Sequence, residues 1–406
     1  MTVSRLPLDG VRILDLGQSV AVPVATLWLA YMGAQVVRIE SRDRGITMRD
    51  WPPFANGIPG QNRSGLGNLF ACNKLSCTLD LSKPLARDLV RELVCISDVV
   101  VENFSTGVAE RMGFGYPELS ALRPDLIMVS LAAFGRSGPM KGGVGFHSAV
   151  ALFSGLSAIT GYPGGHPRIP GSVLPDVVSG TYVVLALVQA LYNRAMTGQG
   201  QYVELAMTEN IMSIMPEAII DYTLNGRQHR RMGNGDIAKA PHGIYPCRGD
   251  DAWISISVED EAQWEALCRL AEHTDWLEDH RFAGALARCY HQEDLDRLLA
   301  EWTRRGEPYE LMHLLQQAGV PAGPALSTKG LLEDPHLQAR GDIVTTDHPE
   351  VGTRSMIGIP WRISGLPPVE YRPAPLFGQH VSFVLGQLLG LPEGEIQRLV
   401  DEGVVA

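Results

Sequence analysis

The stretch VRILDLGQSVAVPVATLWLAYMGAQVVRIE (residues 11–40) decides the fold. It opens with a short apolar run that ends at Gly17, a pattern typical of a buried strand. Helical spacing follows over residues 21–34, with Gly33 as a stop signal, and residues 35–40 form a second apolar run. A strand, a helix and a strand within about thirty residues form a βαβ unit, so the sequence predicts a parallel sheet.

The same alternation continues along the chain and favours an open α/β sheet over residues 7–135. Further strands are predicted at 76–81, 98–104, 126–134 and 202–207. Helices are predicted at 83–96, 115–124, 147–158, from near Val177 to 197–200, and at 208–224.

The pattern of apolar and polar residues changes after residues 226–236. A strand pattern at 252–258 and amphipathic helices over 260–318 predict a smaller α+β domain. The remainder returns through short strands to a final helix near 390–403. We therefore predict an α/β fold in three stretches: the first part of a large domain at 1–224, a small domain at 225–330, and a C-terminal part at 331–406 that returns to the large domain.

Composition and charge argue against several classes of protein. With 406 residues, 45% of them hydrophobic and 19% charged, the chain should fold into two or three domains. Its formal net charge of −11 argues against nucleic acid as a partner, although a small anionic ligand needs only a local basic patch. We expect no leader and no apolar run of membrane length, and therefore a cytoplasmic protein without a membrane partner.

Metal and dinucleotide sites are also disfavoured. The six cysteines form no C-x-x-C pair and no zinc-like cluster with histidine, so we expect free thiols in a reducing compartment and no metal. Glu40 stands where a dinucleotide fold holds the ribose. However, the turn GQSVAVP lacks the glycines that let the backbone approach a pyrophosphate, which argues against NAD(P).

Asp176 is the only charged residue in the apolar run LPDVVSGTYVVLALVQAL, residues 174–191. An Asp here can simply cap the following helix, because it satisfies free backbone N–H groups. The position also suits a nucleophile, since a helix N-terminus stabilises an anion by up to about 2 kcal/mol and the ionised carboxylate is the form that attacks. Both interpretations stay open. Glycines that would let a substrate approach lie upstream, at Gly155, Gly161, Gly164, Gly165 and Gly171.

Two further pairs of residues each have a structural and a functional interpretation. Asn103 and Phe104 end a predicted strand, where ligands bind in open α/β sheets, but a turn cap and a core aromatic have the same pattern. Gly233 and Gly235, in the stretch MGNGD, suit either a mobile loop over a site or a plain connector between domains.

Taken together, the motifs resemble those of class III coenzyme A transferases, the family of formyl-CoA transferase, carnitine CoA-transferase and α-methylacyl-CoA racemase. The resemblance extends over essentially the whole chain. The motifs occur in the family's order: PLDGVRILDL, GAQVVRIE, NKLSCTLDL, VVVENFSTGVAERMGFGY, FGRSGP, GLSAITG, the Asp176 helix, RAMTGQGQYVELAM and GVPAGPALSTKGLLEDPHLQARG.

The resemblance implies a large Rossmann-like domain built from both chain ends, a smaller domain, and two chains threaded through each other as an interlocked homodimer. It places the family's catalytic aspartate at Asp176, whose carboxylate takes up CoA from an acyl-CoA donor as an aspartyl thioester and passes it to a free carboxylic acid. The implied partners are acyl-CoA and a small carboxylic acid, and coenzyme A is a substrate rather than a permanently bound cofactor.

The resemblance also implies site residues. Arg42, one residue after the position of a family arginine, is expected to take over part of its phosphate contact, and Lys83 lies next to the position of a family lysine. The other CoA-binding positions are Leu79, Asn103, Phe104 and Arg111. The substrate-binding positions are Gln18, Phe146, His147, Gly233 and Gly235.

Some residues differ from those of family members at the same positions, and these differences disfavour certain acyl groups and reactions. Ala132 and Phe134 replace a lysine and a tyrosine of formyl-CoA transferase, which argues against formyl and oxalyl groups. The racemase uses a histidine at the position of Phe146, and the neighbouring His147, a type of residue more often structural, is expected to point elsewhere. CoA transfer is therefore preferred to acyl-CoA racemisation, and a non-catalytic CoA-binding protein is a third possibility.

The identity of the acid is inferred from polar and basic side chains. Several side chains could hold a second carboxylate, which suggests a dicarboxylic acid with succinyl-CoA as donor. These are Gln18, Arg136, His147, Arg168 and the basic stretch 227–231, which is equally typical of a charged surface.

Overall fold

The computed structural model describes residues 5–41, 48–171 and 173–405. The chain forms two compact units. The large unit comprises residues 1–157, 169–227 and 338–406, and the small unit comprises 158–168 and 228–337. The large unit thus draws on both chain ends. The small unit includes residues 158–168, which the sequence interpretation assigned to the large domain.

The large unit is built on a six-stranded parallel sheet in the order β3-β2-β1-β4-β5-β6, which is the order of doubly wound folds. Ile13 pairs with Val36 on one side and with Val99 on the other, so the strand order reverses between β1 and β4. Ligands bind at such a reversal, outside the carboxyl ends of the strands. The strands are β1 (Arg12–Asp15), β2 (Gln35–Glu40), β3 (Leu75–Thr78), β4 (Val99–Glu102), β5 (Ile127–Ala132) and β6 (Gln201–Ala206).

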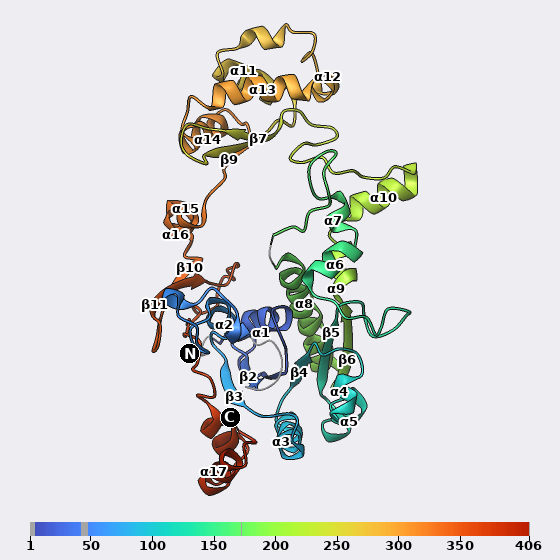
Figure 1. The fold of residues 1–406 in the computed structure, drawn as a ribbon, viewed down its shortest axis with the longest axis vertical. Helices are drawn as coiled ribbons and strands as arrows, with labels where there is room; N and C mark the ends of the chain where they lie inside the picture. The colour runs from blue at the N-terminus through green and yellow to red at the C-terminus, as the bar shows by residue number, and fades with distance from the viewer. Residues whose placement is uncertain (1–4, 42–47, 172, 406) are drawn as a thin grey trace. The chain divides into compact units, whose positions relative to one another are not determined.

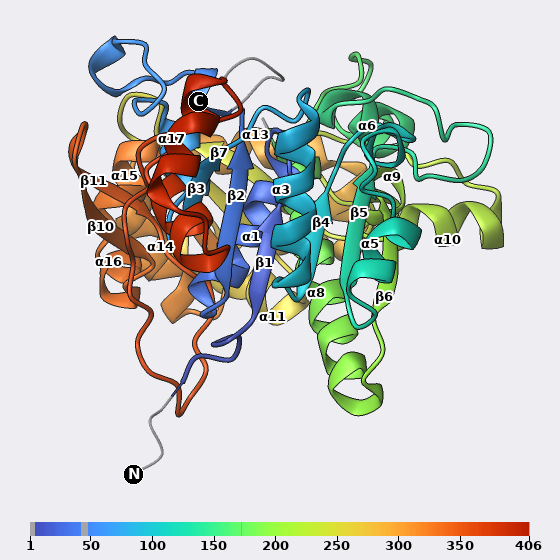
Figure 2. The ribbon, with the colours of Figure 1, turned by 90° about the horizontal axis from the view of Figure 1, so that it is seen from below.

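Each face of this sheet carries its own apolar core, because alternate residues of every buried strand point to opposite faces. Leu14 and Val37 lie in the core on one face, where α3 (Pro84–Cys95), α5 (Tyr116–Leu122) and α17 (Glu393–Asp401) pack. Ile13 and Val36 lie in the core on the other face, where α1 (Ala21–Tyr31) and α8 (Leu174–Thr197) pack. Figure 2 shows α3 and α17 on the same side of the strands.

The close packing of α8 on α1 depends on Gly180. A Cβ atom at this position would lie 2.8 Å from the carbonyl oxygen of Ala21. Helix α8 begins at Leu174, with Pro175 in its first turn, and not near Val177 as predicted; proline is tolerated there because the first N–H groups of a helix have no intrahelical acceptor.

The expectation that no apolar run reaches membrane length is wrong by the measure of length and composition. Helix α8 is long and apolar enough to cross a membrane. A core helix passes the same test, and Val183 and Leu187 of α8 lie in the core of the large unit.

The large unit has further short elements. Near the end of the chain, Val404 and Val405 pack into the core beside α17, and the Asp80 N–H donates to the Val404 carbonyl at 2.9 Å. The other elements are α2 (Gly65–Phe70), α4 (Val108–Arg111), α6 (His147–Phe153), α9 (Met207–Met212), α10 (Pro216–Asn225), the antiparallel pair β10 (Ile343–His348) and β11 (Gly352–Ile357), a π-helix at Ser382–Leu388, and 3₁₀ turns at Met48–Asp50 and Ala55–Gly57. Helices α7 (Leu156–Ile159) and α16 (Pro335–Arg340) span the unit boundaries.

The small unit has a three-stranded antiparallel sheet in the order β7-β8-β9, of which Figure 1 labels β7 and β9. It also has its own aromatic core. Trp264, Trp276 and Phe282 pack in that core, and the buried guanidinium of Arg288 lies 5.0 Å from the ring of Trp264. The elements are β7 (His242–Pro246), β8 (Trp253–Ser257), β9 (Ala322–Pro324), α11 (Glu261–Leu270), a 3₁₀ turn (Thr274–Leu277), α12 (Ala285–Tyr290), α13 (Gln292–Thr303), α14 (Pro308–Gln317) and α15 (Thr328–Glu333).

Candidate active site

A pocket of about 440 Å³ lies at the carboxyl ends of the parallel strands, next to the reversal of strand order. Parallel strands bring loops that are distant in sequence to this edge, which explains why residues from β1, β4 and β5 meet there. The pocket is lined by Gln18, Ser19, Ser41, Leu81, Asn103–Thr106, Val108, Met112, Leu131–Ala133, Gly143–His147, Asp176 and Met207.

Asp176 lies in the first turn of α8 and lines this pocket, with 8% of its surface exposed. It is not the helix cap, because Val173 occupies that position and makes no side-chain bond. Burial raises the pKa of Asp176 to about 6, while the charge of His147 and a bond from its own backbone N–H act in the opposite direction. The helix terminus therefore does not hold the pKa at its usual value, but the carboxylate is still mainly ionised at neutral pH.

His147 faces the same pocket, so the prediction that it points elsewhere is wrong. It begins helix α6, and its charge acts on the carboxyl group of Asp176. Phe146, the preceding residue, also lines the pocket and has 54% of its surface exposed. Both adjacent residues thus line the pocket at the start of α6, which the local sequence pattern does not show.

The turn after β1 forms another wall of the pocket and is held by side chains. The backbone N–H of Gln18 donates to Oδ1 of Asn103 at 2.6 Å, and Nδ2 of Asn103 donates to the carbonyl of Gln18 at 3.0 Å. The N–H of Gly17 donates to Oδ1 of Asp15 at 2.8 Å. Ser19 has a φ of 55°, a left-handed conformation that is uncommon for serine.

Buried ion pairs lie in the sheet close to this turn, and sequence analysis missed them. The Nζ of Lys74 lies 3.2 Å from Oδ2 of Asp15, and both side chains are fully buried. Burial alone would raise the pKa of Asp15, but Lys74 and Arg38 hold it below its usual value. Burial lowers the pKa of Lys74 to about 8. No pattern in the sequence marks Lys74 as a partner of Asp15, because the pair forms only when β1 and β3 lie in one sheet.

Two acidic residues at strand ends are also paired with arginines. Glu40 is buried, and its carboxylate accepts from Arg49 at 2.7 and 3.0 Å. Arg136 donates to buried Glu102 and, at 3.3 Å, to the carbonyl of Phe104. Nη2 makes both of these bonds, which hold the end of β4, whereas Nε and Nη1 are buried without a hydrogen-bond partner among the described residues. Arg136 is not among the residues that line the pocket.

Of the other residues predicted to contact CoA, only some lie at this pocket. Phe104 lines the pocket, and Arg111 is exposed at the end of α4, with its guanidinium beside Gly107. Leu79 is fully buried in the core, its N–H donates to the carbonyl of Glu40 at 2.8 Å, and it does not line the pocket. Lys83 donates to the carbonyl of Glu402 near the end of the chain. Arg42 lies outside the described residues.

The remaining predicted residues belong to the small unit. Gly233 and Gly235 line a separate cleft of about 810 Å³ together with Tyr162. Arg231 donates to the carbonyls of Ala158 and Gly165, which holds the two stretches of the small unit together. Among the residues that the structure describes, no group of three or more His, Cys, Asp or Glu side chains is placed to hold a metal ion.

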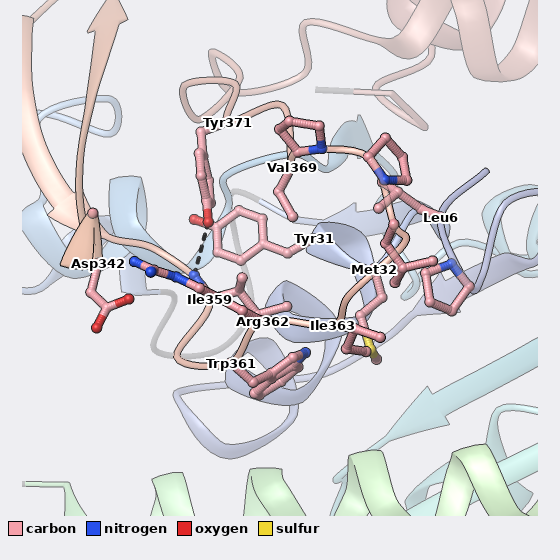
Figure 3. Close-up of a pocket in the computed structure, with 15 residues that line it drawn as sticks. Leu6, Tyr31, Met32, Asp342, Ile359, Trp361, Arg362, Ile363, Val369 and Tyr371 are labelled. Atoms are coloured by element: carbon pink, nitrogen blue, oxygen red, sulfur yellow. Dashed lines mark hydrogen bonds between the residues drawn. The ribbon is translucent and has the colours of Figure 1, made fainter. Parts of the chain in front are cut away.

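Another pocket of the large unit, of about 360 Å³, lies at the carboxyl end of α1, whereas the Asp176 pocket lies at its amino end (Figure 3). Its lining is mostly aliphatic and aromatic, and the hydroxyl of Tyr371 already accepts from the N–H of Ile359 at 3.1 Å. It contains none of the predicted site residues and lies away from the strand ends at which α/β proteins bind ligands. The Asp176 pocket is therefore the candidate active site.

Comparison with known proteins agrees with the resemblance seen in the sequence. Residues 8–381 match the family model described as CoA-transferase family III. The chain belongs to CoA-transferase family III. This CoA-transferase is 35% identical to the succinyl-CoA–D-citramalate CoA-transferase of Chloroflexus aurantiacus, with 98% of each chain aligned. It is 32% identical to the succinate–glutarate CoA-transferase of Agrobacterium fabrum, over 94% of this chain and 96% of the relative.

A solved structure shows the same fold. The CAIB/BAIF family protein from Brucella suis superimposes on the CoA-transferase with a TM-score of 0.85 and 29% sequence identity, over 95% of this chain and 100% of that chain. These findings confirm the predicted family and the prediction that the chain is a CoA-transferring enzyme.

Proposed function

We propose that this enzyme moves coenzyme A from succinyl-CoA to a second dicarboxylic acid, through a covalent thioester on Asp176. Two relatives aligned over almost the whole chain are named for succinyl-CoA with citramalate and for succinate with glutarate, and this supports the substrate class. The observation that carries the catalytic role is the placement of the Asp176 carboxylate, which is buried but lines an open pocket at the strand reversal.

The proposed reaction is a series of balanced acyl exchanges. The ionised carboxylate of Asp176 attacks the thioester carbonyl of the donor, and the C–S bond breaks to give a mixed anhydride and CoA thiolate. The thiolate attacks the aspartyl carbonyl and releases succinate, leaving the aspartyl-CoA thioester. The acceptor carboxylate then attacks this thioester and expels CoA thiolate. The thiolate finally attacks the acceptor's acyl carbon, which gives the new acyl-CoA and restores the carboxylate of Asp176.

The surroundings of Asp176 suit this chemistry. A carboxylate attacks without losing a proton, so the residue needs only to be ionised, which its pKa of about 6 permits at neutral pH. The apolar part of the pocket wall would limit the access of water to the anhydride and the thioester. Leu131, Met207 and the alanines that end β5 provide apolar surface in the pocket.

We assign the acid-binding end to Gln18 and His147. Of the described side chains that sequence analysis put forward for a second carboxylate, these two line the Asp176 pocket, whereas Arg136 is paired with Glu102. A positively charged imidazole beside Asp176 would attract the carboxylate of an acceptor. Phe104 and the loop after it would contact the pantetheine arm, with Arg111, Lys83 and Arg42 toward the phosphates.

We further propose that the enzyme acts as a homodimer. Helix α10 has no buried residue, and its apolar side chains Ile220 and Leu224 have 52% and 75% of their surfaces exposed. Helix α8 likewise exposes Tyr192 and Met196, each at 70%. Apolar area of this extent is typical of a surface covered in an assembly. Light scattering coupled to size exclusion should give twice the mass of the chain.

The cysteines bear on the compartment in which the enzyme works. All six are free thiols, which supports a reducing compartment such as the cytoplasm.

One observation favours a second activity. Because His147 faces Asp176, an imidazole and a carboxylate lie in one pocket, and such a pair can exchange a proton at the carbon next to a thioester. Incorporation of deuterium from D₂O at that carbon, without transfer to an acid, would establish racemisation instead.

The direct test of the proposed function is a matrix of acyl-CoA donors against free acids, with the products identified by mass. We expect product with succinyl-CoA and dicarboxylic acids of four to six carbons. Product with monocarboxylic acids alone would refute the assignment of the acceptor.

A further inference from the structure

We propose that Asn103, which lines the Asp176 pocket, acts as a positioning residue whose side chain fixes the Gln18–Ser19 turn. The proposal rests on the proposed function of this pocket. It concerns a residue that the family resemblance had placed among the CoA contacts.

The side chain of Asn103 already has partners at both ends. Its Oδ1 accepts from the N–H of Gln18 at 2.6 Å, and its Nδ2 donates to the carbonyl of the same residue at 3.0 Å. The pairing also fixes the orientation of the amide, because the reversed amide would place two donors and two acceptors face to face. The carboxamide therefore copies the pairing of a β-ladder and joins the end of β4 to the turn after β1.

The turn that Asn103 holds connects β1 to α1. On one side, Asp15 accepts from the N–H of Gly17 at 2.8 Å. On the other side stands Ser19 at a φ of 55°, a conformation that costs energy for any residue except glycine. Both Gln18 and Ser19 line the pocket. Loss of the bonds to Asn103 would therefore let the wall relax to a conformation in which these two residues move.

Asn103 can serve as an anchor because its neighbours are themselves fixed. The N–H of Phe104 donates to Oε2 of buried Glu102 at 2.7 Å. Arg136 donates to the carboxylate of Glu102 and to the carbonyl of Phe104. Asn103 thus lies between two residues that the buried ion pair of Glu102 and Arg136 holds in place. Because the side chain of Asn103 bonds the turn, the end of β4 determines where the pocket wall lies.

A positioning role and a binding role predict different kinetics. If Asn103 only bound CoA, Asn103→Ala would raise the KM for the donor and leave kcat at saturation unchanged. If it positions the wall, kcat should fall about a hundredfold, as misplacement of a site by about 1 Å does, with the KM for acyl-CoA within about threefold of the wild type. The Kd for free CoA, measured by calorimetry, should also stay within about threefold.

The chain offers a matched control in Asn73. Its Nδ2 donates to the carbonyl of Glu370 at 2.7 Å, and its Oδ1 accepts from the N–H of Arg372 at 2.7 Å. Asn73 does not line the Asp176 pocket. Asn73→Ala therefore removes the same kind of backbone clasp and should lower the melting temperature without lowering kcat.

Asn103→Asp provides a second variant should Asn103→Ala fold poorly. It keeps the acceptor for the N–H of Gln18 but turns an oxygen toward the carbonyl that Nδ2 bonded, so kcat should again fall with little change in KM. A rise in KM and Kd with kcat intact, or an equal loss of kcat in Asn73→Ala, would overturn the positioning role. Failure of the proposed function would look different, because the wild type itself would then form no thioester on Asp176.

Discussion

Replacement of Asp176 by asparagine should remove activity and at the same time stabilise the protein above pH 6. Burial raises the pKa of the carboxyl group from 3.8 to about 6. A difference of about two pKa units corresponds to about 3 kcal/mol of unfolding free energy. The buried charge costs the folded protein no stability below about pH 4, where the group is protonated in the folded and the unfolded state. The full cost is present above about pH 6, where the group is ionised in both states.

Asparagine carries no charge at any pH and has nearly the same shape. Asp176→Asn should therefore unfold at higher denaturant concentration than the wild type at pH 8, with a gain of up to about 3 kcal/mol. The gain should shrink as the pH falls from 6 to 4. Activity should be lost at every pH, because the amide is no nucleophile toward a thioester.

The assay is equilibrium unfolding in urea at several pH values between 4 and 8, followed by tryptophan fluorescence. Asp250→Asn is a suitable control, since Asp250 is exposed in the turn between β7 and β8. It should show no gain that depends on pH. A destabilised Asp176→Asn protein at pH 8, or a gain that is equally large at pH 4, would refute the reasoning that a buried charge is maintained at this position.

The remaining predictions concern the pocket and its support. The rate of transfer should fall as the pH drops through about 6, and a pH profile of kcat/KM measures this fall. His147→Gln should move the fall to higher pH, because the charge of His147 lowers the pKa of Asp176, and an unshifted profile would contradict this charge interaction. Gly180→Ala should cost about 1–3 kcal/mol in urea unfolding, since the new Cβ meets the carbonyl of Ala21, whereas Gly394→Ala, with no atom within 4 Å, should cost almost nothing.

The large sheet could be predicted from the sequence because its signals are local. Short apolar runs such as those around Ile13 and Val36 alternate with helical spacing, and this pattern is enough for a parallel α/β sheet. The C-terminal strands were predicted only as short strands after residue 330, without bounds. The β10–β11 hairpin around Thr346 and Arg354 is mostly exposed, and it lacks the regular apolar alternation that marks a strand.

The candidate site was predictable only in part. Asp176 could be found because a single acid stands out in an apolar run. The clasp between Asn103 and Gln18 joins residues 85 positions apart, and the pair of Asp15 and Lys74 joins residues 59 positions apart. No local pattern encodes such contacts, because they depend on which strands become neighbours.

The most direct test of the central claim is to look for the aspartyl-CoA thioester itself. The enzyme is mixed with succinyl-CoA in the absence of an acceptor acid, quenched, digested and analysed by mass spectrometry. The account predicts that the peptide containing Asp176 carries CoA less one water, and that hydroxylamine converts the adduct to a hydroxamate at the same residue. An adduct on another side chain, or full turnover by Asp176→Asn, would contradict it.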